Sequence, residues 1–334
     1  MKEYFYNDIV FTFEGAVSVE SNPDYFTPWR IDYQRLKMFP VLKENVGRCC
    51  SGVRLCFTTD SKNIILKFDR HDYEIKLDIF INDVLHEKII LEQSSEQVEI
   101  NTRADGKNRF TIWLDQRCQV RMKSISVNDG ALIEKTPVTQ KRWVHYGSSI
   151  SHANAADSPS NIWSAITARK NNLHLTNFGF GGQCKIEPMM AFVIRDLPSD
   201  LITLKLGINV YPGDLTHRTF LPAILGFVRI IRDTNQKTPI VLISPIMCPY
   251  RENVNPIEGH VNLVEMRAYI KEAVEIFQTY GDKNIHYADG LKIFGPDEVK
   301  YMPDELHPNA EGQAVFAANF ENEVLKIPEL KILK

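Results

Sequence analysis

The sequence predicts an all-β sandwich followed by an α/β domain that is built on a parallel sheet. Before residue 136, apolar and polar residues alternate at every second position, and no helical pattern of useful length occurs. After residue 136, strand-like runs alternate with helical ones, which is typical of a parallel sheet covered on both faces. A length of 334 residues is long for one core and natural for two. We therefore predict a β domain at residues 1–135 and an α/β domain at residues 136–334.

The strands predicted in the first domain are short and are separated by Asp, Asn, Ser and Gly, which favour turns. Residues 53–57 and 75–81 alternate apolar and polar side chains, as strands with one buried face do. Residues 82–83 and 104–106 are expected hairpin turns, so an antiparallel sandwich follows. An irregular segment combines aromatic and basic residues, for which core packing is favoured and sugar binding is the alternative: Trp29, Arg30, Tyr33, Arg35 and Phe39.

The second domain begins after a linker at residues 136–139. Its strands are expected at residues 143–146, 173–177, 201–206, 240–244 and 284–288. Ser158 and Pro159 are a suitable N-cap and first-turn proline for a helix with apolar residues along one side. Further helices are expected at residues 220–232, 261–278 and 310–325.

Composition restricts the classes of partner. The net charge is −3 and no large basic block occurs, which argues against nucleic acid. No apolar run reaches the ~18–20 residues that span a bilayer, and acidic residues near the start argue against a signal peptide. The six cysteines show neither metal-site spacing nor a disulfide framework. We therefore expect a cytoplasmic protein with reduced thiols, no membrane partner and a small-molecule substrate. Its oligomeric state stays open.

Four short segments carry polar residues that fit one reaction. In a parallel sheet, the loops that follow successive strands gather at the carboxyl edge, so these distant segments can meet. Each segment alone is also compatible with an ordinary turn or cap, and their joint occurrence in this order favours catalysis. They are Gly147–Ser149, Asn177–Gly182, Gly207–Asn209 and Asp304–Pro308.

The chemistry of these segments is that of acyl transfer. Ser149, at the tip of a strand-to-helix turn, is the expected nucleophile and needs a base to accept its proton. His307 is the expected base, and Asp304, three residues earlier, can orient its ring and stabilise the imidazolium. The oxyanion that develops needs fixed donors. The backbone N–H groups of Ser149 and Gly182 and the side chain of Asn209 can supply them.

At this point the sequence resembles the SGNH hydrolases, also called GDSL-type esterases. The resemblance covers residues 141–326, and the preceding β domain looks like the branch with an appended jelly roll, which includes carbohydrate acetyl esterases. It implies a flavodoxin-like αβα sandwich with a five-stranded parallel sheet, and neither a metal nor an organic cofactor. The residues that match the family blocks are Ser149, Gly182, Asn209 and His307, with Asp304 in the usual Asp-x-x-His.

The match departs from the family pattern at two positions. Ser148 stands where the family name has Asp, which leaves the nucleophile in place. Val210 stands where Asp is common after the oxyanion Asn209, so the support that this carboxylate gives the loop is missing.

Other residues near the four segments have more than one interpretation. His145 is expected to be a packed core histidine, and Cys184 is a rival nucleophile without an evident base. A second group could contact substrate: His152, Gln183, Tyr211, Met247 and Tyr250. For Tyr211, Met247 and Tyr250, core packing is the alternative.

The favoured function is a serine esterase that hydrolyses a small acyl ester through an acyl-enzyme on Ser149. The expected acyl group is acetyl, on a carbohydrate or another hydroxylated metabolite. An acyltransferase that uses the same Ser-His-Asp site is one alternative, and a catalytically silent carbohydrate-binding protein is another. Sequence alone does not separate hydrolysis from transfer, nor does it identify the natural substrate.

Overall fold

The computed structural model describes residues 1–330, which form two compact units. The first, here called the β unit, comprises residues 1–139 and 158–160, and the α/β unit contains residues 140–157 and 161 onward. A single cut after residue 135 therefore differs from the observed division. Residues 158–160 join the β unit because the backbone N–H of Ser160 donates to Asp78 (2.9 Å) and Lys88 Nζ donates to Ser158 Oγ (2.9 Å).

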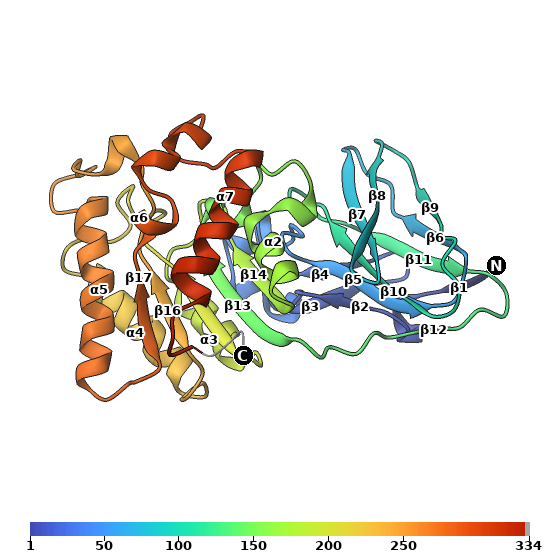
Figure 1. The fold of residues 1–334 in the computed structure, drawn as a ribbon, viewed down its shortest axis with the longest axis horizontal. Helices are drawn as coiled ribbons and strands as arrows, with labels where there is room; N and C mark the ends of the chain where they lie inside the picture. Colours follow the sequence, from blue (N-terminus) through green and yellow to red (C-terminus); the bar gives the residue numbers. More distant parts are fainter. Residues whose placement is uncertain (331–334) are drawn as a thin grey trace. The chain divides into compact units, whose positions relative to one another are not determined.

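The β unit consists of two six-stranded antiparallel sheets (Figure 1). The first sheet contains β1 (Lys2–Tyr4), β3 (Ser18–Ser21), β4 (Phe26–Trp29), β6 (Asn63–Phe68), β9 (Gln97–Asn101) and β11 (Met122–Val127). The second contains β2 (Thr12–Glu14), β5 (Arg54–Thr59), β7 (Ile75–Ile81), β8 (Val84–Leu91), β10 (Asn108–Leu114) and β12 (Ile133–Glu134). Their orders are β3-β4-β11-β6-β9, with β1 on β11, and β12-β5-β10-β7-β8, with β2 on β5. The predicted antiparallel sandwich is confirmed.

Alternating side chains from both sheets build the core of the β unit. Every second residue of β6 is buried, and the rings of Phe57 and Phe110 stack on neighbouring strands with centroids 5.2 Å apart. Asn82 and Asp83 adopt positive φ angles of 49° and 66°, which a tight turn between β7 and β8 requires. In the irregular segment, Arg30 is fully buried and donates to backbone carbonyls, in accordance with the packing interpretation.

The α/β unit contains a five-stranded parallel sheet in the order β14-β13-β15-β16-β17, which is the flavodoxin-like order. Its strands are β13 (Lys141–Gly147), β14 (Leu173–Gly179), β15 (Leu201–Lys205), β16 (Ile240–Ile243) and β17 (Ile285–Ala288). Its helices are α1 (Ser149–His152), α2 (Trp163–Lys170), α3 (Pro188–Asp196), α4 (Phe220–Arg232), α5 (Leu263–Thr279), α6 (Gly290–Ile293) and α7 (Ala310–Phe320). No helix within residues 1–330 is long and apolar enough to cross a membrane.

Helices cover both faces of this sheet (Figure 1). On one face, Trp143 of β13 packs against Trp163 of α2 and Phe320 of α7, with ring centroids 6.0 and 5.2 Å apart. On the other face, Tyr146 stacks on Phe227 of α4 at 5.2 Å. Because successive residues of a strand point to opposite faces, β13 packs against the helices of both layers. The helices leave the carboxyl ends of the strands uncovered, and the loops that follow the strands gather there.

The helix predicted after Ser158 begins later than expected. Pro159 starts a short 3-10 turn that ends at residue 161, and α2 begins at Trp163. The prediction of Ser158 as the N-cap is therefore wrong. Residues 158–160 are bonded within the β unit, and the first N–H of α2 is instead satisfied by the side chain of Gln313 (3.0 Å).

Candidate active site

The turn between β13 and α1 presents Ser149. Ser148 is the N-cap of α1 and accepts from the N–H of Ile150 (3.3 Å), so Ser149 becomes the first helical residue. Two glycines make this tight turn possible, because a Cβ on Gly147 would overlap Ser151, and one on Gly179 would overlap the backbone of the same turn. Ser149 remains only partly buried, so its hydroxyl can be reached.

Three predicted residues meet at the carboxyl edge of the sheet. Ser149 Oγ lies 2.8 Å from Nε2 of His307, and Nδ1 of the same ring lies 2.6 Å from Oδ2 of Asp304. With the ring proton on Nδ1, the carboxylate accepts it and Nε2 is left to accept from the serine hydroxyl. The arrangement is that of a nucleophile, a base and an orienting carboxylate.

The loop before α7 holds the Asp304 carboxylate in place. Its Oδ1 accepts from the backbone N–H groups of His307 (2.7 Å) and Leu306 (3.1 Å), and Glu305 takes a positive φ of 57° between them. Partial burial alone would raise the pKa of Asp304, but hydrogen bonds from the His307 ring and from these two N–H groups lower it below its usual value. The carboxylate is therefore ionised at neutral pH.

The second segment lies against the nucleophile turn, and the third segment is bonded to the loop that follows the second. A Cβ on Gly181 would stand 3.8 Å from Cβ of Ser149, and Gly182 has a positive φ of 71°. The Asn209 side-chain oxygen accepts from the N–H of Cys184 (3.1 Å), which fixes the amide and leaves its NH₂ group to face another acceptor. Asn177 joins the segments, since it donates to the carbonyl of Ser151 (2.9 Å).

The structure shows which residues support the third segment, where position 210 carries no carboxylate. Val210 is fully buried, so its side chain contributes packing. Lys185 supplies the polar support, because its Nζ donates to the carbonyl of Asn209 (2.6 Å) and forms an ion pair with Asp214. Sequence reasoning missed this residue, although a lysine three positions after the Gly182 turn was the available signal.

Comparison with known proteins identifies the family. Models of the GDSL-like lipase/acylhydrolase family and of the SsfX3 N-terminal domain match residues 140–326 and 11–135, respectively. The chain belongs to the GDSL-like lipase/acylhydrolase family. The predicted resemblance to SGNH hydrolases with an added β domain is confirmed. No curated protein matches the chain.

Several solved structures share the whole architecture with this family member. The salicylyl-acyltransferase SsfX3 from a tetracycline biosynthetic pathway is 29% identical, with 99% of this chain and 98% of that chain covered and a TM-score of 0.91. A protein described as a GDSL-like lipase from Bacteroides ovatus is 19% identical, with 98% of both chains covered and a TM-score of 0.76. A family two carbohydrate esterase from Cellvibrio japonicus is 15% identical, with 100% and 99% covered and a TM-score of 0.71.

The other candidates in this GDSL-like domain differ in their surroundings. His152 is buried, and its Nδ1 accepts from the N–H of Gly181 (3.3 Å), so it supports the turn beside the nucleophile. Gln183 and Met247 are half-buried, and hydrogen bonds anchor their backbone N–H groups at 3.0 and 2.9 Å. The rings of Tyr211 and Tyr250 both contact the guanidinium of Arg251.

Two titratable residues near the site, Cys184 and His145, are buried, and their burial keeps both uncharged at neutral pH. Burial raises the pKa of Cys184 to about 12, so its thiol is protonated at neutral pH and is a poor nucleophile. Burial lowers the pKa of His145 to about 3, and its ring nitrogens lie 2.7 Å from the hydroxyls of Thr203 and Ser151. His145 is therefore the neutral core histidine that the sequence predicts.

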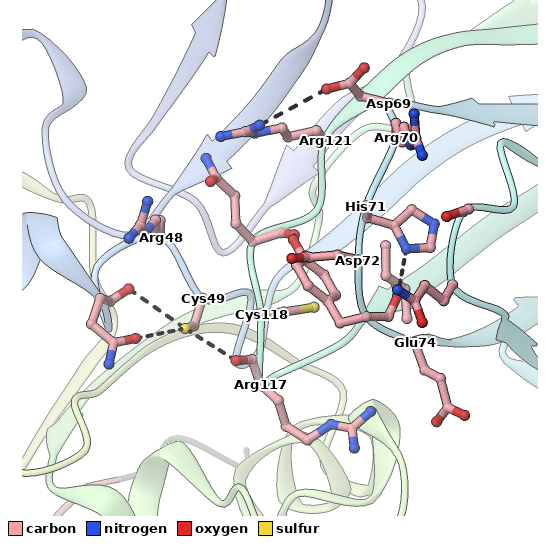
Figure 2. A pocket seen from close by; sticks show the side chains of 16 residues that line it. Arg48, Cys49, Asp69, Arg70, His71, Asp72, Glu74, Arg117, Cys118 and Arg121 are labelled. Atoms are coloured by element: carbon pink, nitrogen blue, oxygen red, sulfur yellow. Dashed lines mark hydrogen bonds and ion pairs between the residues drawn. The ribbon is translucent and has the colours of Figure 1, made fainter.

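A separate cavity of about 910 Å³ lies within the β unit (Figure 2). Its walls carry both signs of charge, and several of these groups are already engaged. Arg117 makes an ion pair with the buried carboxylate of Asp115 (2.7 Å), and Arg121 lies 4.0 Å from Asp69. The thiol of Cys49 points at backbone and side-chain oxygens. The lining therefore shows no concentration of one charge that would select a ligand.

Proposed function

We propose that the protein is a serine esterase that cleaves a small acyl ester of a hydroxylated small molecule through an acyl-enzyme on Ser149. The observation that carries the proposal is the chain of two hydrogen bonds, 2.8 and 2.6 Å long, from Ser149 through His307 to Asp304. Membership of the GDSL-like lipase/acylhydrolase family supports ester cleavage as the reaction class.

In the first half of the reaction, Ser149 Oγ attacks the ester carbonyl while Nε2 of His307 takes its proton. The imidazolium that forms is stabilised by Asp304. The new oxyanion accepts hydrogen bonds from the N–H groups of Ser149 and Gly182 and from the NH₂ group of Asn209. Each such donor typically contributes about 10²–10³ to kcat. When the tetrahedral intermediate collapses, the alcohol leaves with the proton from His307.

In the second half, His307 accepts a proton from water as the water attacks the acyl-enzyme. The acid then leaves, and Ser149 regains its proton from the ring. Every proton in this scheme moves through Nε2 of His307, which is why the tautomer held by Asp304 matters.

An acyltransferase is the second candidate, and one comparison favours it. The similarity to the salicylyl-acyltransferase SsfX3 reaches 29% identity over 99% of this chain. The same acyl-enzyme serves both reactions, since a hydroxyl group of an acceptor can replace water in the second half. The geometry of the three catalytic groups does not distinguish the two.

The test is hydrolysis of 4-nitrophenyl acetate by the wild type and by Ser149→Ala. We expect the variant to lose at least about 10³ in kcat, because the nucleophile is gone. Ser21→Ala, at an exposed position of β3, is the matched control and should retain full activity. Unchanged turnover in Ser149→Ala would contradict the proposal. Added alcohols then separate the candidates, because a transferase yields the acylated alcohol in excess over free acid.

A further inference from the structure

The loops after β15 and β16 hold a stacked arginine. The guanidinium carbon of Arg251 lies 4.9 Å from the ring centroid of Tyr211 and 5.1 Å from that of Tyr250. Such distances are those of cation–π contacts, which orient a guanidinium and leave the edge of its plane free for hydrogen bonds. Tyr211 follows the oxyanion residue Asn209 by two positions, so this cluster belongs to the same edge of the sheet as the catalytic groups.

No carboxylate among the described residues pairs with Arg251. The adjacent acid, Glu252, is already used: it accepts two hydrogen bonds from Arg267 (2.6 and 2.8 Å) and one from the N–H of Cys248 (3.0 Å). The Nε atom of Arg251 is enclosed and has no hydrogen-bond partner within the part of the chain that the structure describes. This enclosed donor is costly and is not itself open to a ligand. Arg251 as a whole is only half-buried, so a ligand can approach the outer nitrogens of its guanidinium.

The cluster also lies within electrostatic reach of the catalytic groups. Burial raises the pKa of Tyr250, Cys248 and Asp304 add to the rise, and Arg251 opposes it. The phenol of Tyr250 is therefore close enough to feel both the guanidinium of Arg251, which it contacts, and the carboxylate of Asp304. On the other side, the hydroxyl of Tyr211 donates to the carbonyl of Val254 (2.9 Å), which connects the two loops that hold the cation.

Resting on the proposed function, we propose that Arg251 binds an anionic oxygen group of the substrate, such as a carboxylate, at a distance from the scissile ester. A planar guanidinium donates two parallel hydrogen bonds to the two oxygens of a carboxylate, and Tyr211 and Tyr250 hold it in one orientation. The esters that this enzyme prefers therefore carry a negative charge. The charge belongs either to the acyl part or to the alcohol part of the ester.

Two pairs of substrates distinguish these positions. For the acyl part, the 4-nitrophenyl monoester of glutaric acid is compared with 4-nitrophenyl pentanoate. For the alcohol part, 4-acetoxybenzoate is compared with 4-acetoxybenzamide. In one of these two substrate pairs, we expect the wild type to favour the anionic ester in kcat/KM by about 10- to 100-fold. This is the usual effect of a hydrogen bond between charged groups.

The variant Arg251→Gln should reduce this preference at least tenfold, mainly through a higher KM for the anionic ester. Arg251→Lys, which keeps the charge but loses the planar fork, should fall between the two. Arg229→Gln, at an exposed position of α4, is the control and should keep the preference of the wild type. Added salt should raise the KM of the anionic ester only.

Equal preferences in the wild type and Arg251→Gln, in both pairs, would overturn the inference while leaving Ser149 chemistry intact. Loss of the proposed function would instead appear as turnover of the neutral esters by Ser149→Ala. If Arg251→Gln does not fold, inhibition of the wild type decides. Glutarate should compete with 4-nitrophenyl acetate at least tenfold better than glutaramide, and equal inhibition by the two would reject the anionic site.

Discussion

Replacing Asp304 with Asn should inactivate the enzyme by reversing one hydrogen bond. Oδ1 of this carboxylate accepts from two backbone N–H groups, at 2.7 Å from His307 and 3.1 Å from Leu306, while Oδ2 accepts from the ring at 2.6 Å. In Asp304→Asn, the amide oxygen takes the Oδ1 position, because only an oxygen can accept from the two N–H groups. The NH₂ group then faces Nδ1 of His307 and donates to it.

This reversal moves the ring proton to Nε2, 2.8 Å from Ser149 Oγ, where the catalytic base needs a free lone pair. The wrong tautomer costs about 10⁴ in kcat in a triad of this kind. That loss corresponds to about 5 kcal/mol in the barrier. Stability should change far less, because the side chains of Asp304 and His307 are 54% and 36% exposed and such pairs contribute about 0–1 kcal/mol.

The assay is the steady-state kcat for 4-nitrophenyl acetate, with circular dichroism and thermal unfolding to show that the variant is folded. Glu305→Gln is the matched control, since it removes the neighbouring exposed carboxylate, and it should keep the kcat of the wild type. A folded Asp304→Asn enzyme that retains more than about a tenth of that kcat would refute the tautomer argument.

Two further predictions concern Asn209 and Lys205. Asn209→Ala should lower kcat by about 10²–10³ with little change in KM, because its amide acts on the oxyanion rather than on bound substrate. A rise in KM by the same factor as the fall in kcat, measured in steady-state kinetics, would contradict this. Burial lowers the pKa of Lys205 to about 8, so the unfolded chain binds its proton more tightly. Lys205→Met should therefore raise the free energy of unfolding at pH 7 by about 3 kcal/mol. In urea titrations this gain should shrink between about pH 8 and 10.5, and exposed Lys271→Met should show no such gain.

The position of the candidate active site was predictable because a topological rule places it at one edge of the sheet. Strand-like runs mark where each parallel strand ends, and the loops at those ends share one edge of the sheet. Ser149 and His307, which are 158 positions apart, therefore meet within hydrogen-bonding distance although no local pattern joins them. Asp304 could be predicted from its spacing alone, because it precedes His307 by three residues.

Features that depend on long-range side-chain contacts were not predictable. Ser158 has the local sequence of an N-cap, but residues 158–160 are bonded to Asp78 and Lys88, and the α-helix starts only at Trp163. Similarly, the sequence shows that a carboxylate is missing at position 210. The ion pair of Lys185 with Asp214 that supports the loop is visible only in three dimensions.

Two cationic side chains in the α/β unit show that the meaning of an unsatisfied donor depends on whether a ligand can reach the side chain. Nζ of Lys205 and Nε of Arg251 both lack a hydrogen-bond partner among the residues described. Lys205, the last residue of β15, is only 1% exposed, so a substrate cannot reach it and its cost falls on stability alone. Arg251 is only half-buried, follows the carboxyl end of β16 and is held by two rings. A fully buried lysine without a partner therefore lowers stability, whereas a partly exposed and oriented arginine can bind an anionic group of a ligand.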